Sequence, residues 1–247
     1  MEIEPLHLAK APIVEAVIDL DCDLGPQFDV QSVLTAATDA FGNEYPKMEK
    51  QWVHEIQVKY NENETVQSGL PTLNALRFWS LDGKQLVQVR RQGFSFNRLT
   101  PYTNLDDYIP HVKGLWDTFR SFVPVRSVLQ LSLRYINHID PGIEPGSLWE
   151  LSDYFTIARS NAWNDSVKIN SFLINYAGRS DLHHAGFQVV LSSSAASGAI
   201  LDLAVYQELG IEPENWDAII EAVKTLRLFK NELFKEAITE KCLQMYQ

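Results

Sequence analysis

The chain has 247 residues, of which 45% are hydrophobic and 21% are charged, and 21 Lys and Arg stand against 32 Asp and Glu for a net charge of −11. This hydrophobic content excludes a disordered or collagen-like chain and is sufficient for a large core. The negative charge argues against general binding to nucleic acid or to an anionic membrane, because both require a basic surface.

The compartment is indicated by the cysteines and by the start of the chain. Cys22 and Cys242 form neither a disulfide framework nor a zinc-binding Cys/His motif. Residues 1–5 lack the basic and apolar regions of a signal peptide, and no apolar run reaches the length of about 20 residues that a membrane helix needs. We therefore expect a cytoplasmic protein without membrane contact, cofactor or bound metal.

The first half predicts a strand, a helix, several antiparallel strands and a second helix. Hydrophobic periodicity distinguishes the strands from the helices. Asp82-Gly83 is typical of a two-residue hairpin turn, and Asn104 is a plausible cap for the second helix. The expected strands are 11–24, 51–60, 73–80, 84–91 and 94–99, an exposed loop is expected at 61–64, and the expected helices are 30–41 and 105–123.

The second half repeats this order after Pro124. Its expected strands are 127–139, 167–176, 187–191 and 199–206, with a short helix at 148–155 and a long apolar-striped helix from 214 to near the C-terminus.

The order predicts an α+β fold in a single domain, 1–247, formed by a duplication with halves 11–124 and 125–247. One curved antiparallel sheet would be covered by helices. This order is similar to the saddle-like sheet of the TATA-box-binding-protein fold and, more loosely, to the helix-grip folds.

Three short stretches carry a resemblance to a known family. They are Lys10–Ala16 (KAPIVEA), Leu133–Asn137 (LRYIN) and Phe234–Glu240 (FKEAITE). In this order and at this spacing they resemble a sporadically distributed family of uncharacterised prokaryotic proteins of this size. The resemblance covers almost the whole chain and implies no activity.

Common catalytic motifs are absent from the sequence. Neither GxxxxGK[ST] nor GxGxxG is present for phosphate binding, and neither HExxH nor GxSxG is present for hydrolysis. We therefore predict a non-enzymatic binding or regulatory protein and name no catalytic residue.

A row of carboxylates alternates along the first predicted strand. Asp19, Asp21 and Asp23 share one face, about 6.5 Å apart along the strand. A solvated face is the simpler interpretation. The alternative is a metal-assisted or acid–base hydrolase, in which the carboxylates hold a hard cation and His138 acts as general base.

A polar face is also expected on the strand 127–139, where Arg134 and His138 alternate with buried leucines. If a two-fold axis relates the halves, Glu15 and Arg134 lie across from one another. Their pairing is then either a surface ion pair or an anchor for a ligand or partner. The candidate binding face comprises Glu15, Asp19, Asp21, Lys59, Arg134 and His138.

Basic and aromatic residues are interleaved in the first half. The basic set is Arg77, Arg90, Arg91 and Arg98, and the aromatic set is Phe78, Trp79, Phe94 and Phe96. This composition is typical of a platform that stacks single-stranded nucleic acid. It is equally typical of a half-buried sheet with aromatics toward the helices and arginines toward water, which the net charge favours.

The end of the last helix carries Cys242, Leu243, Met245 and Tyr246. These residues either complete the core or form an exposed apolar tail that contacts a second copy. We expect a protein partner or self-association, and a small ligand is the alternative.

Overall fold

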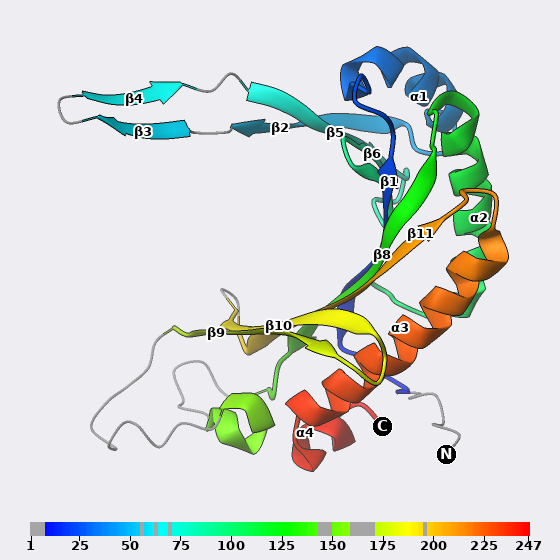
Figure 1. Ribbon diagram of the computed structural model, residues 1–247. Helices are drawn as coiled ribbons and strands as arrows, with labels where there is room; N and C mark the ends of the chain where they lie inside the picture. The colour runs from blue at the N-terminus through cyan, green and yellow to red at the C-terminus, as the bar shows by residue number, and fades with distance from the viewer. Residues whose placement is uncertain are drawn as a thin grey trace.

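The chain folds as an α+β protein around one large curved sheet. In the computed structural model, nine antiparallel strands form an open C-shaped sheet, and the two long helices pack on its convex side (Figure 1). The structure describes residues 8–54, 57–61, 64–68, 71–142, 150–158, 171–194 and 197–247.

The strands and helices have the following bounds. The large sheet contains β1 (Ile13–Asp23), β2 (Lys47–His54), β5 (Pro71–Trp79), β6 (Gln85–Arg90), β7 (Gly93–Leu99), β8 (Ser127–Ile139), β9 (Leu173–Ser180), β10 (Ala185–Ser193) and β11 (Ala199–Ile211). A separate ribbon contains β3 (Gln57–Asn61) and β4 (Glu64–Ser68). The α-helices in the described residues are α1 (Leu34–Phe41), α2 (Leu105–Phe122), α3 (Trp216–Ala237) and α4 (Glu240–Gln244).

The strand order is symmetrical about the middle of the sheet. The order is β2-β5-β6-β7-β1-β8-β11-β10-β9, so β1 and β8 form the central antiparallel pair. On one side β1 is followed by β7, β6 and β5, and on the other side β8 is followed by β11, β10 and β9. The first strands of the two predicted halves are therefore neighbours.

The core lies between the sheet and the helices. Helix α2 covers β7, and α3 crosses β8 and β11. Phe94 and Phe96 on β7 and Trp116 on α2 are almost completely buried, and the rings of Phe94 and Trp116 are 5.8 Å apart. Burying each of these rings stabilises the fold by about 1.5–3 kcal/mol or more.

The cap predicted for α2 is confirmed. The side chain of Asn104 accepts a hydrogen bond from the backbone N–H of Asp106, and Asp106 and Asp107 place negative charge in the first turn. Both features stabilise a helix start, since they satisfy a free N–H and complement the helix dipole. In the described part of the chain, no helix is both long and apolar enough to cross a membrane.

The predicted strand over 51–60 was wrong as one element. β2 ends at His54, and β3 starts at Gln57 in the separate ribbon. Trp52 on β2 is 49% exposed. The alternation of polar and apolar residues predicts an extended backbone, but it does not show whether the whole segment remains in one sheet. Asn61 and Glu64, expected in a loop, pair as the ends of β3 and β4, and residues 62–63 lie outside the described residues.

The second half also differs from the prediction. Where a helix was expected over 148–155, the described residues form two short 3-10 turns, Leu151–Asp153 and Thr156–Ala158. The strand predicted at 167–176 begins later, at Leu173, and continues to Ser180. The earlier part of that prediction, 167–170, lies outside the described residues.

The last predicted helix is interrupted after Ala237. Ile238 adopts an extended conformation, and the Thr239 side chain accepts a hydrogen bond from the backbone N–H of Cys242 to begin α4. The suggestion of an exposed apolar tail was wrong, because α4 folds back against the core. Cys242 is fully buried, and the residues that pack around it include Leu243, Met245 and Tyr246.

Candidate functional site

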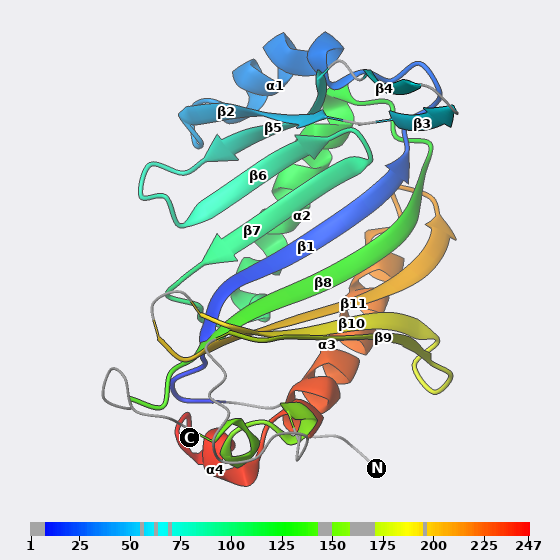
Figure 2. The same ribbon diagram turned by 90° about the vertical axis from the view of Figure 1, so that its left-hand side faces the viewer.

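The concave face of the sheet is polar and faces away from the helices. Figure 2 looks onto this face and shows α2 and α3 behind the sheet. Residues directly opposite one another in antiparallel strands point to the same side, so the strand pairing defines the face. The polar residues on its central strands are Glu15, Asp19, Asp21, Gln88, Arg90, Ser95, Asn97, Gln130, Ser132, Arg134 and Asp202.

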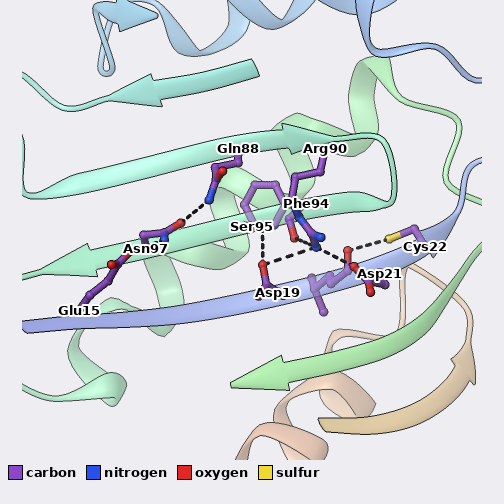
Figure 3. A network of polar contacts seen from close by, with 10 residues as sticks. Glu15, Asp19, Asp21, Cys22, Gln88, Arg90, Phe94, Ser95 and Asn97 are labelled. Atoms are coloured by element: carbon purple, nitrogen blue, oxygen red, sulfur yellow. Dashed lines mark hydrogen bonds and ion pairs between the residues drawn. The ribbon is translucent and has the colours of Figure 1, made fainter. Parts of the chain in front are cut away.

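Arg90 is the centre of an ion-pair network on this face (Figure 3). Its Nη2 donates to Asp21 Oδ1 at 2.7 Å and to the carbonyl oxygen of Phe94 at 3.2 Å, and it lies 3.5 Å from Asp19 Oδ1. The Ser95 hydroxyl donates to Asp19. Two carboxylates therefore share one guanidinium, and about a fifth of its side chain, 18%, is exposed.

Burial dominates the electrostatics of Asp19. The loss of solvent around its carboxyl raises its pKa, against the lowering effects of Arg90 and of the Ser95 hydrogen bond. Asp19 was expected on a solvated strand face, whereas its side chain is 28% exposed.

A backbone feature brings β1 and β7 close beside this network. Gly93 has φ +146°, and a Cβ at this position would lie 2.1 Å from the carbonyl oxygen of Leu20. Glycine alone therefore fits here. The close approach lets the Cys22 N–H donate to the carbonyl oxygen of Gln92 at 2.7 Å.

A second chain of hydrogen bonds holds Glu15. Gln88 Nε2 donates to Asn97 Oδ1 at 2.8 Å, and Asn97 Nδ2 donates to Glu15 Oε1 at 2.6 Å (Figure 3). Asn97 is 5% exposed, and both of these hydrogen bonds involve its amide. These contacts link β6, β7 and β1.

The expected pairing of Glu15 with Arg134 was wrong in register. Arg134 lies opposite Val17, on the same face as Glu15, and Glu15 lies opposite Ile136. The guanidinium instead forms a bidentate pair with Asp202 on β11, with Nε donating to Oδ1 at 2.9 Å and Nη2 to Oδ2 at 2.5 Å. This carboxylate raises the pKa of Arg134. The side chain of Arg134 is 48% exposed, so the pair is at the surface.

The structure does not bring together the residues of the hydrolase alternative. Gln130 lies opposite Asp21, and His138 follows eight residues later on β8, about 26 Å along the strand. His138 Nε2 lies 2.7 Å from the carbonyl oxygen of Ser197, and Asp23 Oδ1 accepts from the backbone N–H of Gly25. Among the described residues, no group of three His, Cys, Asp or Glu side chains is placed to hold a metal ion.

Lys59 is not part of the large sheet. It belongs to β3 in the ribbon, where it pairs with Val66 of β4. The candidate face predicted from the sequence therefore separates into three places: the central strands with Glu15, Asp19, Asp21 and Arg134, the far end of β8 with His138, and the ribbon with Lys59.

The basic and aromatic residues of the first half are divided between the two faces. Arg77 and Arg90 point to the concave side, Arg98 lies opposite Ala16 on the helix side, and Arg91 follows β6 in a turn. The buried Phe78, Phe94 and Phe96 face the helices, and Trp79 stacks with Arg77 at 5.5 Å. The half-buried arrangement thus holds for the three phenylalanines and for Arg77 and Arg90, whereas Arg98 faces the helices and Trp79 lies beside Arg77 on the concave side.

A cavity on the helix side was not predicted from the sequence. It has a volume of about 240 Å³ and lies between the start of β1, the end of β8, the segment before α2 and the helix α3. Its lining includes Lys230, which is 9% exposed. The signal was present in the helical spacing, because Lys230 follows Leu226 by four residues and precedes Phe234 by four, on the buried face of the helix.

The three stretches that carry the family resemblance meet at this cavity. Ile13 from the first stretch, Tyr135 and Asn137 from the second, and Phe234 from the third all contribute to its wall. No family model matches the chain, and no curated protein matches it in a sequence search. The concave face and the cavity are therefore the features of this chain that indicate a function.

Proposed function

We propose that the protein is a non-enzymatic binding protein that holds a protein partner on the concave face of its sheet. The observation that carries this proposal is the separation of the two faces. The long helices α2 and α3 pack on the convex side (Figure 2), and the concave side presents polar side chains of both charges, among them Asp21, Arg90 and Arg134. A protein surface of mixed charge is the partner that such a face fits best.

The internal pairing of the charges supports recognition. Arg90 with Asp21, Asn97 with Glu15 and Arg134 with Asp202 fix side chains of five strands in defined positions. A partner that docks on these side chains would lose little further conformational entropy in ordering them. The exposed Arg134–Asp202 pair is the most accessible of these contacts and the best point for a perturbation.

The geometry favours binding over the two alternatives. The hydrolase needs His138 beside the aspartates, but the aspartates on β1 lie beside the first half of β8, whereas His138 is near the end of that strand. A base-stacking platform needs arginines and aromatic rings on one accessible face, and the arginines are divided between faces while Phe94 and Phe96 are buried. A small ligand on the concave face is the other occupant that the sequence suggested.

The fold proposal rests on the symmetrical strand order. We propose that the halves 11–124 and 125–247 are a duplication, because β1-β7-β6-β5 and β8-β11-β10-β9 repeat one arrangement with a long helix after each set. This arrangement favours a likeness to the saddle-shaped TATA-box-binding-protein fold or to the helix-grip folds. Membership of the sporadically distributed prokaryotic family is proposed on the three quoted stretches alone.

The test compares partner binding by folded variants that differ in the charge pattern of the concave face. Arg134→Glu breaks the surface pair, and the double variant Arg134→Asp with Asp202→Arg restores an ion pair with the opposite polarity. The control is Lys224→Glu on the exposed side of α3. All proteins are checked for folding by circular dichroism, and proteins that co-purify from the native cell are quantified by mass spectrometry.

The binding proposal predicts that a partner recovered with the unmodified protein and with Lys224→Glu is lost with both concave-face variants. The double variant is the decisive sample, because it keeps the pair and changes only the pattern that a partner meets. Identical recovery with all four proteins would contradict the proposal.

A further inference from the structure

Lys230 is a buried cation whose neighbours do not neutralise it. Its side chain is 9% exposed, and it forms no ion pair with any residue that the structure describes. Its recorded contact is with the face of Tyr135, where Nζ lies 4.1 Å from the ring centroid. A lysine this deeply buried normally has a carboxylate partner, because an isolated charge is costly to remove from water.

The described groups around the cavity explain why none of their carboxylates compensates the amine. Asp106 on α2, an acid in the cavity wall, is engaged by Arg227, whose Nη1 lies 2.9 and 2.8 Å from its two carboxylate oxygens. Arg227 Nη2 also donates to Asn104 Oδ1 at 3.2 Å. From β8 and from the segment before α2, the cavity receives Tyr135 and Tyr102, which bring phenol rings and no carboxylate.

The electrostatics favour the neutral amine. Loss of solvent is the main cause that lowers the pKa of Lys230 to about 7, and the neighbouring Arg227 cation lowers it further. At pH 7 about half of the molecules then carry an uncharged amine, against on the order of one in a thousand for an ordinary exposed lysine. A desolvated lysine beside another cation is the environment in which proteins make lysine a nucleophile.

The amine faces a space that fits a small organic molecule. The cavity volume is about 240 Å³, and a protein cavity of about 150 Å³ is sufficient for benzene. Ile13 and Phe234 contribute apolar wall, and Asn137 and Asn231 contribute amides. Asn137 is 2% exposed and donates to the carbonyl oxygens of Tyr135 and Leu201, which holds that side of the wall in place.

We propose that Lys230 forms a reversible imine with a small aldehyde or ketone that enters this cavity. The Nζ lone pair adds to the carbonyl carbon, and a carbon–nitrogen bond forms. The carbonyl oxygen takes up two protons in total and leaves as water, while the nitrogen loses both of its protons. One amine and one carbonyl therefore give one imine and one water, and the step needs no oxidant or reductant. This covalent site is separate from the concave face and does not depend on partner binding there.

The test measures imine formation at each lysine by reductive trapping. The full chain is treated at pH 7 with benzaldehyde or with formaldehyde in the presence of sodium cyanoborohydride, and the rate of modification is followed by peptide mass spectrometry. Lys224, exposed on the same helix, is the internal reference. We expect both aldehydes to modify Lys230 at least about tenfold faster than Lys224, with a rate that reaches half of its maximum near pH 7.

Two variants separate the cavity from the amine. Lys230→Arg keeps a cation and abolishes the modification at this position. Ile13→Phe fills the cavity and leaves the amine in place, so benzaldehyde modification of Lys230 is expected to fall about tenfold while formaldehyde modification persists. Peptide mass spectrometry distinguishes Lys230 from Lys224 in the unmodified protein. The comparison of their rates therefore does not require that either variant folds.

The outcomes are decisive in both directions. Fast modification of Lys230 by both aldehydes supports the proposal. Modification by formaldehyde alone shows a reactive amine without a ligand cavity and overturns it. Rates at Lys230 equal to or below those at Lys224 with both aldehydes also overturn it.

Discussion

On the concave face the Arg90 guanidinium meets two carboxylates, whereas behind the sheet the Lys230 ammonium meets an aromatic ring and, among the residues that the structure describes, no carboxylate. Both side chains are largely buried, but the net charge of the groups around them has the opposite sign in the two places. Around Arg90 negative charge is in excess, and around Lys230 positive charge is in excess because Arg227 already occupies Asp106.

This difference separates a structural role from a chemical one. Removing Arg90 would leave two carboxylates without a counter-ion, so the fold depends on it. Removing the charge of Lys230 would remove the free-energy cost of burying that charge, so the charge destabilises the fold. A buried group that the fold would be more stable without is a candidate for function.

The largest effect is expected from Lys230→Met. The unfolded chain holds the lysine proton up to about pH 10, and the folded chain releases it at about pH 7. Between these values the stability of the unmodified protein therefore rises with pH, by up to about 1.4 kcal/mol per unit. We expect Lys230→Met to be more stable by about 2–4 kcal/mol at pH 7 and to lose this slope, as measured by urea unfolding at pH 6 to 10. A destabilised variant with an unchanged slope would show that the charge is compensated.

The opposite sign is expected from Arg90→Met. Breaking a buried ion pair by removing one partner costs about 3–5 kcal/mol, and the partial exposure of Asp19 and Asp21 reduces this to about 2–3 kcal/mol. The measurement is the midpoint of urea unfolding at pH 7. Equal stability of variant and unmodified protein would contradict a structural role for the network.

A smaller gain is expected from Asp19→Asn. Because burial raises the pKa of Asp19, the folded state disfavours its charged form above that pKa. The asparagine amide oxygen can still accept from Ser95, so we expect a gain of up to about 1 kcal/mol at pH 7. The gain should disappear well below pH 3.8, the ordinary pKa of the carboxyl, where Asp19 is protonated in both states. A loss at pH 7 would instead show that Arg90 needs both carboxylates.

The smallest effect is expected from Arg134→Met. Its pair with Asp202 is well formed, but Arg134 is 48% exposed, and such pairs contribute about 0–1 kcal/mol. Thermal unfolding should therefore change by only a few degrees. A larger loss of stability would show that this pair has a structural role like that of the Arg90 network.

The sequence predicted the parity of the sheet but not its lateral contacts. Alternation placed Glu15, Asp19 and Asp21 on one face of β1, as the structure shows. It could not identify Arg90 or Asp202 as ion-pair partners, because those residues are 69 and 68 positions away from Asp21 and Arg134 in the chain. Such pairs are set by strand order and register, which a local pattern does not contain.

The cavity illustrates a different limit. Helical spacing places Lys230 among the apolar residues on the buried face of α3. The spacing alone does not show which groups surround the lysine. The answer depends on Arg227 binding Asp106 across the helix interface, 121 positions away. The amine, its aromatic neighbour and the cavity come from three separate regions of the chain.

The contrast between the two regions can be tested most directly by measuring the protonation of Lys230 itself. Nuclear magnetic resonance of protein labelled with ¹³C and ¹⁵N at the lysine side chains would follow each Nζ between pH 5 and 11, with Lys230→Arg identifying the signal. We predict a pKa of about 7 for Lys230. A pKa above 10 would contradict the account, because it would require a counter-ion or water that neutralises the cavity.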